Sequence, residues 1–207
     1  MPAPPSLKQL TKSLAMLDAL IQREWEYRYY SFDSKWADYG EMASMRNGQG
    51  DGWSCVFGSG GVFLKGFDHE SEMSALSKQP PNVWPGVLDS VPSTFKDCLL
   101  EPAFSMVDTT FCIWRLPEHA QWKTGRISYP AGDDPDGSGR LLSILDANPD
   151  SYKKWADEYY ERSISLTAIQ QIYEGTPLTP ELVRELNPDV QFASLLGDAA
   201  EIAYPTA

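Results

Sequence analysis

The chain has 207 residues, with 17 lysine and arginine and 29 aspartate and glutamate residues, so its formal net charge is −12. Nucleic-acid binding needs a surplus of basic side chains on one face, and this charge therefore argues against a nucleic-acid partner. A hydrophobic content of 42%, with 7 Trp, 10 Tyr and 8 Phe, excludes a disordered chain. We predict a single domain over residues 1–207, because this length is ample for a hydrophobic core.

The sequence predicts neither a targeting segment nor a membrane segment. Met1–Ser6 lacks the basic start and the apolar stretch of a signal peptide, and no run approaches the roughly 18 apolar residues of a membrane span. The three cysteines are Cys55, Cys98 and Cys112. Their odd number and wide spacing favour buried apolar roles over a disulfide framework or a zinc cluster. We expect a cytoplasmic protein without a membrane partner.

The first predicted element is an amphipathic helix. We expect Ser6 to cap its N-terminus, with Gln9 three residues later as in a capping box. Its apolar stripe consists of Leu7, Leu10, Leu14, Leu17 and Ile21. The spacing is nearly that of a heptad repeat, but the stretch is short and has few complementary charges. Packing on the protein's own sheet is therefore favoured over a coiled coil between molecules.

Alternation of apolar and polar residues predicts a sheet-forming part from about residue 24 to 130. The predicted strands comprise 41–46, 53–57, 62–66, 107–116 and 122–129, after an aromatic stretch at 27–32. Glycine-rich turns separate the early runs, which predicts an antiparallel meander followed by a hairpin. The glycines between Gly48 and Gly61 also suggest a phosphate-binding loop. Such a loop leads from a strand into a helix, whereas a strand follows each turn here, so hairpin turns are favoured.

A C-terminal group of helices is predicted over residues 139–207. Asn148 and Pro149 mark the start of one helix, Gly175 the end of the next, and Thr179 with Pro180 the start of a third. The predicted fold class is therefore α+β. It combines an N-terminal helix, an antiparallel sheet of about five or six strands, and the C-terminal helices.

Asp68, His69 and Glu70 gather ionisable groups at the end of a predicted strand, where catalytic residues often lie. They are candidates for acid–base chemistry or for metal ligation. The other histidine, His119, falls in a predicted turn, and the spacing of zinc-protease ligands is missing. A nucleophilic pair of Cys55 with His69 is a further alternative, although a cysteine in an aromatic strand is more often part of the core. A structural role for His69 is favoured.

The acidic stretch 132–141 partly matches a calcium-binding loop. Asp134 at the first position would place Asp136 third and Ser138 fifth, which are oxygen-ligand positions. The twelfth position, however, is Leu145, where a bidentate glutamate is needed. An acidic turn that caps a helix over 141–145 explains the same residues. Calcium is the one cofactor that the sequence suggests, and this turn is its candidate site.

A mixed acidic and aromatic surface is predicted on the helix that starts near Asn148. Its candidate partner-binding residues are Asp157, Glu158, Tyr159, Tyr160 and Glu161. Residues 101–207 carry a net charge of −9, against −3 for residues 1–100. A partner attracted by charge would be a basic protein that meets the second half of the chain. Solubility alone is the competing explanation, and the oligomeric state is left open.

Three segments carry a resemblance to known proteins: Tyr29–Trp36, Gly66–Ser71 and Asp108–Trp114. They resemble an uncharacterised bacterial protein family, and the likeness covers most of the chain from about Trp25 onward. This family brings no established activity, so it assigns no functional residue. In type, the acidic α+β chain with exposed aromatics is similar to bacterial immunity proteins that neutralise basic toxins.

Three hypotheses follow for the function. The first is a non-enzymatic cytoplasmic binding protein, in the form of an immunity-type inhibitor of a basic toxin domain. The second, from another class, is a hydrolase-like small-molecule enzyme with its site near Asp68, His69 and Glu70. The third is a calcium-binding module at Asp134, Asp136 and Ser138.

Overall fold

The computed structural model describes residues 1–207, except for the side chain of Ser77. The chain forms two compact units. The helical unit consists of Met1–Lys35 and Ile144–Ala207, and the sheet unit consists of Trp36–Ser143. Among the described residues, no helix combines the length and the apolar character that crossing a bilayer demands.

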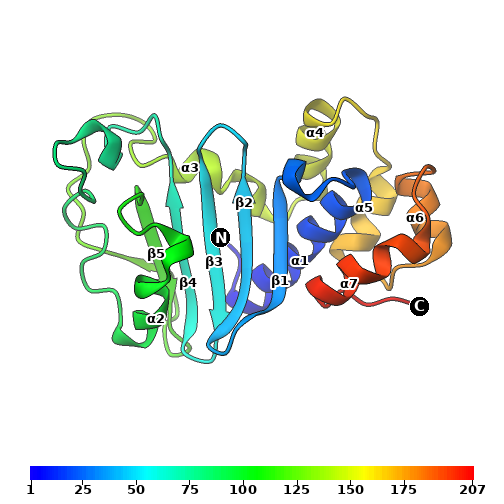
Figure 1. Ribbon diagram of the computed structural model, residues 1–207, viewed down its shortest axis with the longest axis horizontal. Coiled ribbons are helices and arrows are strands. Elements are labelled where there is room, and N and C mark those ends of the chain that lie inside the picture. The colour runs from blue at the N-terminus through cyan, green and yellow to red at the C-terminus, as the bar shows by residue number, and fades with distance from the viewer. The chain divides into compact units, whose positions relative to one another are not determined.

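The predicted α+β class is confirmed, because the chain contains a six-stranded antiparallel sheet with helices before and after it (Figure 1). Its strands are β1 (Tyr30–Ala37), β2 (Gly40–Arg46), β3 (Gly52–Gly58), β4 (Gly61–Phe67), β5 (Phe111–Arg115) and β6 (Lys123–Thr124). They follow one another in chain order across the sheet. In the register, Cys55 of β3 lies opposite Ala43 of β2 and Leu64 of β4.

The last hairpin is shorter than predicted. Instead of starting at Val107, β5 starts at Phe111, because residues 105–109 form a turn. In this turn the Asp108 N–H donates to the Ser105 carbonyl at 2.7 Å and the Thr109 hydroxyl to the Met106 carbonyl at 2.9 Å. These local bonds occupy the polar groups that a longer strand would pair.

Both faces of the central strands β3 and β4 are buried, so the strict alternation predicted for Trp53–Phe57 is incomplete. On one face, Val56 and Phe63 pack into a cluster with residues that follow β4 in sequence, including Phe95 and Cys98 around α2 (Lys96–Leu100). All three cysteines are free and buried, as predicted.

The helical unit is built around α1 (Pro4–Ile21), which is buried over most of its length. The other helices are α4 (Pro149–Tyr159), α5 (Leu166–Tyr173), α6 (Pro180–Leu186) and α7 (Leu196–Ile202). Helix α1 contacts α5, α6 and α7. Two buried polar side chains tie the helices together, with the Ser13 hydroxyl donating to the Ile172 carbonyl at 2.8 Å and the Asn187 amide to the Leu20 carbonyl at 2.9 Å. Residues from the two ends of the chain therefore form one core.

The prediction that Ser6 caps the first helix is wrong. Helix α1 begins at Pro4, with Ala3 as its N-cap and no side-chain capping bond. Proline suits the first helical turn because its φ is already helical and its missing N–H would have no partner there. The predicted caps further on are confirmed, since the Asn148 side chain accepts the Asp150 N–H and Thr179 accepts the Leu182 N–H.

Candidate functional site

Four ionisable side chains come together in the sheet unit at one end of the β3–β4 hairpin. Gly52 lies opposite Phe67, so the residue before β3 and the residue after β4 are neighbours at one end of the hairpin. These residues are Asp51 and Asp68, and the segment that contains Arg140 folds over them. We call Asp51, Asp68, His69 and Arg140 the ionic cluster.

Asp51 fixes the orientation of the His69 ring. The Asp51 Oδ1 atom lies 2.6 Å from His69 Nδ1 and also accepts the His69 backbone N–H at 2.9 Å. A carboxylate only accepts hydrogen bonds, so Nδ1 carries the proton and Nε2 is the nitrogen left for other partners. The Asp51 side chain is 3% exposed, whereas that of His69 is 35% exposed. A buried carboxylate thus orients a histidine that solvent can reach.

The other oxygen of Asp51 is also fully engaged. Its Oδ2 atom accepts the Asn47 amide at 2.8 Å and Arg140 Nη2 at 3.0 Å. Burial alone would raise the pKa of Asp51, but the hydrogen bonds from His69, Arg140 and Asn47 outweigh it and hold this pKa at about 2. Asp51 is therefore ionised at neutral pH.

Arg140 joins the two aspartates. Its Nη2 atom donates to Asp68 Oδ2 at 2.8 Å as well as to Asp51. Asp68 also accepts the Glu70 N–H at 3.0 Å, and its own N–H donates to Thr110 Oγ1. The hydrogen bonds to the two carboxylates raise the pKa of the Arg140 guanidinium. The ionic cluster thus holds the segment around Arg140 against the ends of β3 and β4.

A glycine makes this close approach possible. Gly137 has a φ of +76°, and a Cβ added there would lie 2.2 Å from Asp68 Oδ2. Any other residue would be strained in this conformation and would also displace the carboxylate.

The ionic cluster has two chemical capacities. His69 Nε2 can accept or donate a proton, and the hydrogen bond to Asp51 raises the pKa of His69 above its usual value, against a smaller opposing effect of burial. Asp51, Asp68 and His69 also offer metal-ligand atoms that lie within 4.8 Å of one another. Arg140 already supplies a positive charge to both carboxylates, so a cation would have to displace it.

The structure joins two of the three predicted catalytic candidates. Asp68 and His69 belong to the ionic cluster, whereas Glu70 is exposed and contributes its backbone N–H. Sequence reasoning missed Asp51 and Arg140. Asp51 had a usable signal, because an antiparallel pairing of 53–57 with 62–66 already places it beside Asp68. Cys55 lies opposite Leu64, five residues before His69, and burial raises the pKa of its thiol, which does not suit a nucleophile.

The acidic turn uses its carboxylates to hold backbone amides. Asp134 accepts the N–H groups of Gly139 and Arg140, both at 2.8 Å, and Asp136 accepts the Ser138 N–H at 2.9 Å. These bonds stabilise the start of α3 (Ser138–Leu141). The sequence also suggested helix capping for this turn, but it predicted that the capped helix starts at residue 141, three residues later than α3 does. Calcium binding at Asp134, Asp136 and Ser138 stays a prediction.

The predicted partner-binding residues lie at the end of α4 and just beyond it. Glu158, Tyr159 and Glu161 are exposed. Asp157 is partly buried and accepts both Lys153 Nζ and the Ile164 N–H, and Tyr160 is partly buried as well. The Tyr159 ring stacks on Trp155 at 5.2 Å, which holds an exposed aromatic side chain in a fixed position.

The structure has a second exposed aromatic surface, which we did not predict from the sequence. The segment Glu24–Tyr27, which we call the acidic aromatic segment, is exposed throughout and contains one short 3₁₀ turn. Trp25 is 55% and Tyr27 60% exposed. No local pattern in the sequence distinguishes these two from aromatic residues of the core.

Two arginines flank the acidic aromatic segment and fix it to α7. Asp198 accepts Arg23 Nη1 at 2.9 Å and Arg28 Nη1 at 2.6 Å. Arg28 also donates from Nε to the Gln22 carbonyl at 2.9 Å. Both ends of the exposed segment are therefore held in place.

The negative charge is divided evenly in the folded protein. The helical unit has nine basic and fifteen acidic residues and the sheet unit eight and fourteen, so each has a net charge of −6. The excess of acidic residues beyond residue 100 therefore does not belong to one unit. The reason is that α1 and the residues after it lie in the helical unit together with the C-terminal helices.

Comparisons with protein-family models, curated proteins and solved structures give no significant match. The resemblance to a bacterial family and the likeness in type to immunity proteins stay predictions.

Proposed function

We propose that the protein is a non-enzymatic binding protein that recognises a basic protein partner through the acidic aromatic segment. One observation carries this proposal: Trp25 and Tyr27 are 55% and 60% exposed and alternate with the exposed carboxylates of Glu24 and Glu26. Tryptophan and tyrosine are the residues that most often dominate the binding energy of protein interfaces. Lysine and arginine side chains bind favourably both to carboxylates and to aromatic faces.

The anchoring of the segment supports the proposal. Binding is weakened when a flexible segment must become ordered, and the bonds of Arg23 and Arg28 to Asp198 remove part of that cost before the partner arrives. The chain continues to Tyr29, whose ring contacts Tyr159 of α4 at 5.1 Å. The predicted surface at Glu158, Tyr159 and Glu161 therefore adjoins the segment and extends the proposed interface.

The specific form we propose is an immunity-type inhibitor that acts in the cytoplasm on a basic toxin domain. A net charge of −12 would speed the encounter with such a domain. The test is calorimetry with the basic domains encoded beside the gene, at increasing salt. We expect affinity to fall steeply with salt and His69→Ala to leave it unchanged. If none of these domains binds the protein, the proposal is contradicted.

The ionic cluster favours a second candidate function, a hydrolase-like activity with His69 as general base. The 2.6 Å contact with Asp51 and the partial exposure of the His69 side chain are its support. Hydrolysis of p-nitrophenyl acetate tests it, with His119→Asn as the matched control. The enzyme hypothesis requires His69→Asn to abolish turnover while His119→Asn retains it. Equal rates in both variants would remove this candidate.

A further inference from the structure

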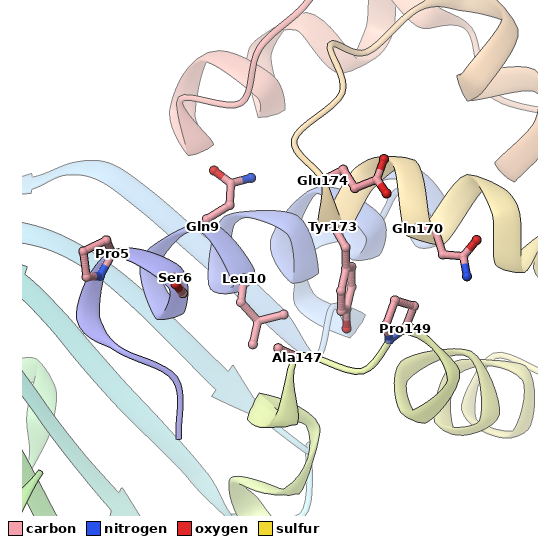
Figure 2. A pocket seen from close by; sticks show the side chains of 9 residues that line it. All are labelled: Pro5, Ser6, Gln9, Leu10, Ala147, Pro149, Gln170, Tyr173 and Glu174. Carbon is pink, nitrogen blue, oxygen red and sulfur yellow. The ribbon is translucent and has the colours of Figure 1, made fainter. Parts of the chain in front are cut away.

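An open groove lies in the helical unit where the start of α1, the start of α4 and the end of α5 meet (Figure 2). Its volume is about 700 Å³. Cavities of about 300–1,000 Å³ hold drug-sized ligands, so this one has room for a side chain together with its neighbouring residues. None of the residues discussed above as catalytic or partner-binding candidates lines it.

Part of the groove wall is apolar. Leu10 of α1 and the ring of Tyr173 of α5 face each other across it, with Pro149 beyond the hydroxyl end of the tyrosine (Figure 2). The Tyr173 hydroxyl is buried and has no hydrogen-bond partner among the described residues. The walls thus suit an aliphatic stem or a flat group, and one buried polar atom is left to be satisfied.

Several polar groups of the groove can accept hydrogen bonds from a cation. Glu174 is the only charged residue among the described residues that line it, and Gln9 and Gln170 add amide oxygens. Helix α5 ends at Tyr173, so its C-terminal end, which carries partial negative charge, also lies at the groove.

An anion is disfavoured for a separate reason. The starts of α1 and α4 both lie at the groove, and free N–H groups at helix N-termini usually bind anions. Here the first turns contain Pro4, Pro5 and Pro149, which have no N–H to offer. The donors of an anion site are therefore reduced at both helices, while the acceptors of a cation site are present.

From this arrangement we infer that the groove binds an arginine side chain of the basic partner. The inference rests on the proposed function, which supplies the partner, and it adds a second point of contact to the acidic aromatic segment. The aliphatic part of the arginine packs on Leu10, and the planar guanidinium lies against the Tyr173 ring. Its N–H groups donate to Glu174 and to the glutamine oxygens. Arginine fits better than lysine because a planar group with five donors matches acceptors from two helices.

The test is a ¹H–¹⁵N NMR titration of the full chain with N-acetyl-arginine amide. We expect the side-chain amide signals of Gln9 and Gln170 to shift with millimolar affinity. Glu174→Gln should weaken this binding about fivefold or more, because it removes the charged acceptor. Glu181→Gln, which changes an exposed carboxylate on α6, is the matched control and should leave affinity unchanged. Both positions are exposed, so neither change should disturb folding.

N-acetyl-citrulline amide, which has nearly the same shape without the charge, should shift these signals far less. Equal shifts with citrulline, larger shifts with acetate than with the arginine probe, or no shifts at all would overturn the inference. This outcome is separable from failure of the proposed function, which is measured with the toxin domain and with changes at Trp25 and Tyr27. If the arginine probe does not bind the groove while the acidic aromatic segment still binds the toxin domain, only the inference about the groove is contradicted.

Discussion

The hydroxyl of Tyr152 donates to Asp18 Oδ1 at 2.9 Å, and this carboxylate in the last turn of α1 is completely buried. Its other oxygen accepts the N–H groups of Tyr29 and Tyr30 at 2.9 and 2.7 Å. Burial raises the pKa of Asp18 to about 6 in spite of these hydrogen bonds. Asp18 thus fixes the chain just after the acidic aromatic segment, at the expense of stability at neutral pH.

Stability of the protein should therefore depend on the ionisation of Asp18. The folded state binds this proton more tightly than the unfolded state, whose carboxyl has its usual pKa near 4. The contribution of Asp18 is greatest below pH 4 and falls by about 3 kcal/mol as the pH rises through 6. Urea unfolding of Asp18→Asn, which keeps an oxygen acceptor, should lack this decline between pH 4 and 7. If the free energy of unfolding of the variant declines by the same amount, groups other than Asp18 cause the decline.

Asp51 should show the opposite dependence. Its folded-state pKa of about 2 lies below the usual value, so its stabilisation is complete above pH 4 and is lost as the pH falls toward 2. We expect Asp51→Asn to lower the free energy of unfolding by about 2 kcal/mol at pH 7 and by much less near pH 2. The exposed Asp133→Asn is the control and should have little effect at either pH. A constant difference between wild type and Asp51→Asn at all pH values would contradict this account.

The pKa of His69 provides a test of the contact between His69 and Asp51 that does not depend on a stability measurement. Asp51 raises the pKa of His69 above its usual 6.5, so the imidazolium stabilises the folded state fully below that usual value, and this contribution is lost as the pH rises through the folded-state pKa. In Asp51→Asn we expect the His69 pKa, followed by NMR, to fall. An unchanged His69 value would show that the 2.6 Å contact does not control its titration.

Gly137 provides a test of how the ionic cluster is assembled. Gly137→Ala should destabilise the sheet unit by about 1–3 kcal/mol, since alanine is strained at a φ of +76° and its methyl group meets Asp68. Gly197→Ala in α7 is the control, because nothing lies within 4 Å of an added Cβ there. Alanine is the better helix former, so this change should be neutral or stabilising. Similar losses in both variants would argue against a special role for Gly137.

Local patterns predicted much of the fold. The glycine turns and alternating runs predicted β2, β3 and β4, and the Asn148–Pro149 and Thr179–Pro180 pairs predicted the starts of α4 and α6, because each of these signals acts within a few residues. The start of α1 was missed since prolines rather than Ser6 begin it. The pairing of α1 with α5, α6 and α7 depends on packing between residues far apart in sequence, which no local pattern encodes.

The candidate sites were predictable to a smaller extent. Asp68 and His69 were recognised from their position after a strand, but Arg140 reaches Asp68 only through the folding of the acidic turn. The segment that carries Trp25 and Tyr27 is held on both sides by the Arg23 and Arg28 bonds to Asp198, a residue about 170 positions away in the chain. A pattern of aromatics alone does not separate such anchors from core residues.

The proposed role of the acidic aromatic segment is to bind a basic protein. Its most direct test is the dissociation constant for a basic toxin domain encoded beside the gene, measured with the double variant Trp25→Ala/Tyr27→Ala. Tyr129→Ala is the control, as this tyrosine is 48% exposed on the sheet unit. We predict a loss of at least about 30-fold for the double variant, as expected for interface hot spots, and no change for the control. Equal affinity of wild type, control and double variant would contradict the account.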